Sequence, residues 1–141
     1  MGGCGKYMRH IIYIIAAVLC IAFASCGKPT NAVNPDEVAA RAAKVYFEYL
    51  LHGNCEAYID GFYRPDSIPD SYREQLIVSA KQYVGQMKND HQGLVSVEAA
   101  GAHTDTTKNV GEAYLILGFG DKTKEEVVVP LVRHEGNWML R

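Results

Sequence analysis

The side chains best suited to chemistry in this chain of 141 residues are thiols and imidazoles, from four cysteines and five histidines. Protein zinc sites usually take such residues in close pairs, as in His-x-His, His-x-x-x-His or Cys-x-x-Cys. None of these pairs occurs, nor does a phosphate-binding loop, a dinucleotide fingerprint or a Gly-x-Ser-x-Gly elbow. The sequence therefore predicts no metal and no cofactor. The histidines after the N-terminal segment stand apart, as His52, His91, His103 and His134.

Cys26 is the thiol in the most informative setting, because it directly follows an apolar segment. Residues 11 to 24 are 14 residues without a charge, and a helix of that length reaches only about 21 Å. A bilayer core is about 30 Å thick. Lys6 and Arg9 precede the segment and small residues close it, which is the order of a secretory signal peptide. We therefore expect the protein to be exported.

Two cleavage sites overlap at the end of this segment. Ala22-Phe23-Ala24 fits ordinary signal peptidase, which would cut before Ser25 and leave Cys26 and Cys55 free to form a disulfide. Phe23-Ala24-Ser25-Cys26 instead resembles the lipobox of bacterial lipoproteins. That resemblance implies a cut before Cys26, a diacylglycerol on its sulfur, and attachment to the membrane. We favour this lipoprotein interpretation over the soluble one. The sequence also leaves open whether translation starts at Met1 or at Met8.

The residues after Cys26 fit an anchored domain. Residues 26 to 35 contain two prolines, a glycine and small polar residues, a composition typical of a flexible tether. Gly27 follows Cys26 where some bacteria use Asp to retain lipoproteins in the inner membrane, so we expect the outer membrane of the cell envelope rather than the inner one. The sequence thus divides into a signal peptide (1–25), a tether (26–35) and a folded domain (36–141).

The charge of the folded part excludes one class of partner. Without residues 1 to 25, 12 basic and 16 acidic side chains remain, a formal charge of −4. Nucleic-acid-binding domains usually carry a basic stripe that neutralises phosphates. No nucleic acid is expected as a partner.

The folded part begins with helical periodicity and changes to strand periodicity after Gly93. An N-cap, Pro35 and two acids open the first helix, whose apolar side is expected to hold Val38, Ala42, Val45, Tyr46, Tyr49 and Leu50. Further helices are expected over 55–62 and from Asp70 to about 88, and strands over 95–99, 111–120, 125–134 and 138–141. Pro130 cannot donate a hydrogen bond within a sheet, so its strand should be an edge or carry a bulge. This order predicts an α+β fold, with about three helices packed on a curved antiparallel sheet of about four strands.

Two stretches make the resemblance to a family specific. Residues 42–54, AAKVYFEYLLHGN, and 126–138, EVVVPLVRHEGNW, resemble small bacterial lipoproteins that carry an NTF2-like domain, the DUF4878-type group. The likeness covers about residues 36 to 141. It implies a cone-shaped domain with a pocket, and it implies no particular reaction.

NTF2-like enzymes of the ketosteroid isomerase kind use an Asp base and a hydrogen-bond donor inside a hydrophobic cone. The corresponding candidates are Asp60 as the general base, with Tyr46, Tyr63 and Tyr114 as donors. Against this, no spacing links these residues, and the tyrosines fit core positions. We therefore favour a non-catalytic module that binds a small apolar ligand or an envelope protein, with an isomerase or dehydratase acting on a small apolar molecule as the alternative.

Overall fold

The computed structural model describes residues 32 to 141. Three helices come first, followed by four strands: α2 (Pro35–Leu51), α3 (Cys55–Asp60), α4 (Asp70–His91), β1 (Leu94–Asp105), β2 (Val110–Phe119), β3 (Lys124–His134) and β4 (Asn137–Leu140). The predicted signal peptide, Cys26 and most of the predicted tether lie outside the described residues. None of the helices in the described part is both long and apolar enough to cross a membrane.

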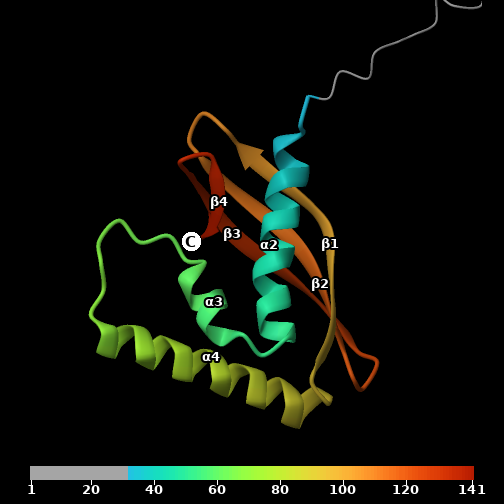
Figure 1. Ribbon diagram of the computed structural model, residues 1–141. Helices are drawn as coiled ribbons and strands as arrows, with labels where there is room; N and C mark the ends of the chain where they lie inside the picture. Colours follow the sequence, from blue (N-terminus) through green and yellow to red (C-terminus); the bar gives the residue numbers. More distant parts are fainter. Residues whose placement is uncertain (1–31) are drawn as a thin grey trace, which may run out of the picture. The chain divides into compact units, whose positions relative to one another are not determined.

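The four strands form one antiparallel sheet in the order β1-β2-β3-β4. Helix α2 lies along one face of this sheet, and α3 and α4 follow beyond its C-terminal end (Figure 1). The predicted α+β fold, with helices packed on one face of a curved antiparallel sheet, is confirmed.

Helix α2 begins where the sequence predicts but turns a different side to the sheet. The Asn34 side chain accepts a hydrogen bond from the backbone N–H of Asp36 at 3.0 Å, with Pro35 in the first turn. The expected apolar side was wrong in part, because Val38 and Val45 are exposed. The buried side is made of Ala39, Ala40, Ala43, Phe47 and Leu50. Small alanine side chains let the helix backbone approach the sheet closely, which leaves the larger residues to the flanks.

Strand β1 is longer than the predicted 95–99, since it continues to Asp105. Its pairing with β2 shifts between Leu94 and Ser96 and again between Ala99 and Gly101. An extra residue at a bulge reverses the alternation of side chains after it. The alternation of inward and outward side chains is therefore interrupted at Ala100. For that reason the sequence pattern did not reveal that the strand continues beyond Ala99.

Strand β3 is internal over one half and an edge over the other. Residues Leu131 to His134 pair with β4, whereas the residues before them pair only with β2 among the described strands. Pro130 stands at the boundary, and its carbonyl accepts a hydrogen bond from the Arg141 backbone N–H at 3.1 Å. Its nitrogen, which has no hydrogen to donate, therefore points away from β2. Pro130 thus lies where β3 changes from an edge to an internal strand, so the predicted edge is confirmed only for the half before it, and no register shift lies beside it.

The hydrophobic core lies between α2 and the sheet. Ala113, Leu115 and Leu117 of the central strand β2 are fully buried, in contact with a cluster that includes Phe47 and Ile59. Cys55, at the start of α3, belongs to the same cluster and is 3% exposed. No polar or charged residue is buried in the part of the chain that the structure describes.

Candidate functional site

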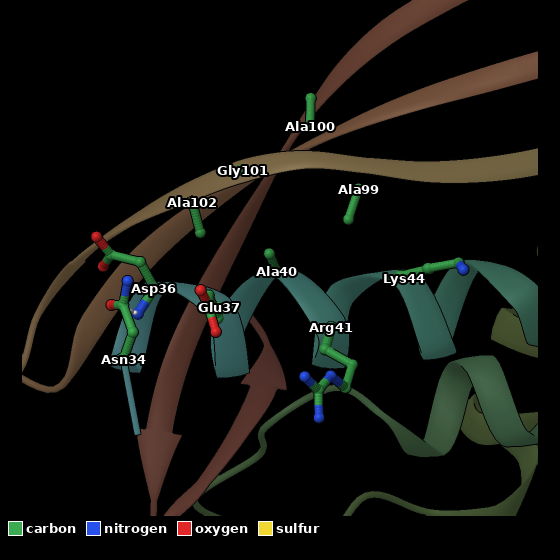
Figure 2. Close-up of a pocket in the computed structure, with 10 residues that line it drawn as sticks. All are labelled: Asn34, Asp36, Glu37, Ala40, Arg41, Lys44, Ala99, Ala100, Gly101 and Ala102. Carbon is green, nitrogen blue, oxygen red and sulfur yellow. Dashed lines mark hydrogen bonds between the residues drawn. The ribbon is translucent and has the colours of Figure 1, made fainter. Parts of the chain in front are cut away.

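A hollow runs between α2 and the bulged middle of β1, and we call it the α2–β1 groove. Its volume is about 570 Å³. Ala40 of the helix points toward the strand, and Ala99 and Ala102 of the strand point toward the helix (Figure 2). These small side chains form the bottom of the groove, and it stays open to solvent.

Charged residues of both signs line the α2–β1 groove. Asp36 accepts a hydrogen bond from the Thr104 hydroxyl at 2.5 Å, which ties the start of α2 to the end of β1. Lys44 is paired with Glu48 at 3.5 Å on the helix surface. Arg41 points away from β1 (Figure 2). The charges are thus spread and hydrated, and the groove concentrates no single charge on a ligand.

A smaller hollow of about 190 Å³ lies at the edge of the sheet, and we call it the aromatic pocket. Phe47 of α2, Tyr58 of α3 and Phe62 form one wall. Their rings make successive edge-to-face contacts, Phe47 on Tyr58 at 5.8 Å and Tyr58 on Phe62 at 5.4 Å. Packing of this kind holds each ring in one orientation. The opposite side consists of Val128, Val129, Pro130, Leu140 and Arg141.

The backbone after α3 fixes the position of the aromatic wall. The Leu140 N–H donates to the Gly61 carbonyl at 2.9 Å, and the Tyr63 N–H donates to the Leu140 carbonyl at 2.7 Å. Phe62 therefore extends alongside β4 as a short parallel bridge to Leu140. Because β4 ends there, the first half of β3 has no strand on that side among the described residues, and the aromatic pocket opens at this point.

Tyr58 is the polar group of the aromatic wall. Burial, helped by the neighbouring Tyr83, raises the pKa of Tyr58 to about 12. The phenol therefore stays neutral at any physiological pH. A neutral phenol cannot act as an anionic base.

Asp60, the predicted general base, is engaged elsewhere. Its carboxylate accepts two hydrogen bonds from Arg73 of α4, at 2.8 and 2.7 Å, and half of its side chain is exposed. The hydrogen bonds from Arg73 hold the pKa of Asp60 below its ordinary value. It lines neither the α2–β1 groove nor the aromatic pocket.

The three predicted tyrosines lie in three different surroundings. The Tyr46 hydroxyl donates to the Trp138 carbonyl at 3.0 Å, and its ring lines a further groove between α2 and β4. Tyr63 packs against the His134 ring at 4.9 Å between centroids. Tyr114 alternates with the buried residues Ala113 and Leu115, so it belongs to the sheet face opposite α2. The structure brings none of them together with Asp60 around one hollow.

The residues of the aromatic pocket were not predicted as a site. Tyr58 and Phe62 stand four positions apart, a spacing that places two rings on one side of a helical turn. Pro130 was singled out as an edge residue, and an edge is where a pocket of a curved sheet can open. These two signals lie about 70 residues apart in the sequence, and nothing in the sequence joins them. The described part of the chain contains no group of three potential metal ligands.

Comparison with known proteins supports the fold. No protein-family model and no curated protein matches the chain. Among solved structures it is similar to a Campylobacter jejuni protein described as an NTF2-like transpeptidase, with 12% sequence identity and a TM-score of 0.52. The match covers 71% of this chain and 94% of that one. At this identity the likeness concerns the fold alone. The folded domain of this chain therefore has an NTF2-like fold, as its resemblance to that family implied.

Proposed function

We propose that this chain is a cell-envelope lipoprotein of the DUF4878 type, anchored through Cys26, whose NTF2-like domain binds a small apolar ligand without transforming it. The observation that carries this proposal is the contrast between interior and edge. The interior of the described domain holds no buried polar or charged residue, while an aromatic pocket stays open at the sheet edge. Such a domain offers a ligand apolar contacts but few side chains that could take part in a reaction.

Acid–base catalysis places a titratable group in a desolvated pocket, where burial adjusts its pKa to the reaction. In this domain the carboxylate proposed for that role, Asp60, is hydrated and paired with Arg73. The one perturbed group of the aromatic pocket, Tyr58, is shifted away from neutral pH. The geometry thus supports binding more than an isomerase or dehydratase, and docking to an envelope protein remains the second form that binding can take.

The burial of Cys55 supports lipidation of Cys26. A disulfide between Cys26 and Cys55 needs the second sulfur within reach of the first. Cys55 is packed in the core at 3% exposure, so pairing would require α3 to open. Lipidation of Cys26 requires no change in the folded domain.

Intact mass spectrometry of membrane-extracted protein tests the anchor. The expected mature chain begins at Cys26 and carries the mass of acyl chains, whereas Cys26→Ala carries none. Cys55→Ala is the matched control, because it removes the other thiol and should keep the acyl mass. A mature chain that begins at Ser25, with a disulfide from Cys26 to Cys55, would contradict the proposal.

A further inference from the structure

Helix α2 carries a second set of apolar residues, on a side that the core does not use. These residues follow one another at steps of four, three and four positions, and we call them the α2 stripe: Val38, Ala42, Val45 and Tyr49. The steps repeat the a and d positions of a heptad, the spacing by which two helices pack side by side. The α2 stripe is thus patterned to receive a second helix.

The fold leaves the α2 stripe partly open to solvent. Val38 is 36% exposed and Val45 is 40% exposed. All four residues of the stripe line the groove between α2 and β4, which has a volume of about 400 Å³. An apolar helix face beside such a groove is a surface on which an amphipathic helix can dock.

The charges on one flank of the α2 stripe favour a second copy of this chain as the occupant. Arg41 and Glu48 lie seven positions apart, so they take equivalent places on this flank. When two α2 helices run antiparallel, these flanks face each other, and Arg41 of each copy meets Glu48 of the other. In a parallel pair the same flank would face Ala39 and Tyr46, which carry no charge, so no ion pair would form.

Both charged side chains are available for such contacts. Arg41 points away from β1 (Figure 2) and forms no ion pair with any residue that the structure describes. Glu48 lies 3.5 Å from Lys44, and both of these side chains are more than a third exposed. Such a surface pair is weak, and a carboxylate has acceptor sites for a second cation.

We propose that two copies of this chain associate through antiparallel α2 helices. Val38 of each copy packs against Tyr49 of the other, and Ala42 packs against Val45, with the two ion pairs on the flank. A two-fold axis across the middle of the α2 stripe generates every contact twice. The stripe is short, so the association relies on the high local concentration that the proposed anchor provides, and in this respect it rests on the function proposed above. It does not depend on a ligand in the aromatic pocket.

Cysteine cross-linking in cells that produce the full-length protein tests the orientation of the two helices. The double variant Val38→Cys/Tyr49→Cys should form a covalent dimer when copper phenanthroline is added as the oxidant. Val38→Cys alone and Tyr49→Cys alone are the matched controls. In an antiparallel pair each of these thiols is displaced from its own counterpart by about 16 Å along the helix, too far for a disulfide. Cys55 is 3% exposed and should not react.

A charge exchange tests the ion pairs. In the double-cysteine protein, Arg41→Glu should lower the cross-linked fraction by about threefold or more, because two attractive pairs become repulsive. Adding Glu48→Arg should restore it. Lys81→Glu is the matched control, since it reverses an exposed charge on α4 and should leave the dimer unchanged.

Three outcomes would overturn the proposed dimer. One is cross-linking of either single-cysteine variant, which indicates parallel helices. Another is no dimer from the double variant, as expected if the helix of a different protein occupies the groove. The third is no recovery when Glu48→Arg is added to Arg41→Glu. The acyl mass on Cys26 is measured separately, so loss of the anchor and absence of the dimer are told apart.

Discussion

Gly61 holds together two parts of the domain that are far apart in sequence. It ends α3, and its carbonyl accepts the hydrogen bond from Leu140 that aligns Phe62 with β4. A Cβ atom at this position would overlap the ring of Tyr46. The same ring carries the hydroxyl that bonds to Trp138. The absence of a side chain at Gly61 thus allows α2, α3 and β4 to meet.

Replacing Gly61 by alanine should therefore destabilise the protein. The added methyl group must displace the Tyr46 ring, and inserting carbon atoms into a packed site costs about 1–3 kcal/mol. Gly85→Ala is the matched control, because it lies inside α4 with open space where its Cβ would be. That change should stabilise the protein by about 0.5–1 kcal/mol. Urea unfolding measures both, and a neutral Gly61→Ala would refute the role given to this glycine.

At the scale of elements, the sequence predicted all three helices and all four strands of the described domain, together with their order. Residues that cap or end an element, such as Asn34, Pro35 and Gly93, mark the element boundaries in the local sequence. Which side of α2 faces the sheet was predicted poorly. Valines and tyrosines dominate a count of apolar residues, but the close approach of helix and sheet is decided by Ala39 and Ala43.

The candidate site was less predictable than the fold, for a related reason. The aromatic pocket joins residues of α2, α3, β3 and β4 with Phe62, which follows α3, and Arg141, which follows β4. Their meeting depends on where β4 ends and on the backbone bonds of Gly61 and Leu140. Asp60 and the tyrosines were chosen by residue type alone, and residue type does not specify that Arg73 of α4 reaches Asp60.

The observed orientation of α2 gives a stability prediction. Ala43 is completely buried against the sheet and Val45 is 40% exposed. Ala43→Leu should cost about 1–3 kcal/mol through overpacking, whereas Val45→Ala should change stability by no more than about 0.5 kcal/mol, as surface changes usually do. The orientation inferred from valines and tyrosines requires the opposite ranking. Denaturant unfolding of the two variants decides between the two orientations.

At the scale of the whole molecule, the described domain keeps its charges in water and stabilises several of them locally. Asp121, in the turn before β3, accepts hydrogen bonds from the Thr123 hydroxyl and backbone and lies 3.0 Å from the His91 ring. These bonds, the Thr123 hydroxyl first, lower the pKa of Asp121 to about 2. Bonds from Thr107 and Lys108 in the turn before β2 lower the pKa of Asp105 to about 2.

These lowered pKa values set the direction of the pH dependence. The unfolded chain takes up protons near pH 3.8, the ordinary value for these carboxyls, and the folded protein does so only near pH 2. Stability should therefore be fully present above about pH 5 and fall as the pH drops toward 2. Thermal unfolding of the wild type and of Asp121→Asn tests this. The variant should be less stable at pH 5, and the difference should shrink near pH 2. A difference that stays constant would contradict the assignment.

The half-open edge of β3 would matter most if the protein is anchored to a membrane, as proposed above, and so held at high local concentration. An exposed edge is a template on which a second copy can add a strand, and charged residues and proline prevent this. Lys124, Glu125 and Glu126 occupy the half of β3 that pairs on one side only, and Pro130 lies at the end of that half. The other edge, β1, is interrupted by its two shifts of pairing. Replacing the charges at this edge with apolar residues would leave the fold intact and turn a neighbouring copy into a partner for aggregation.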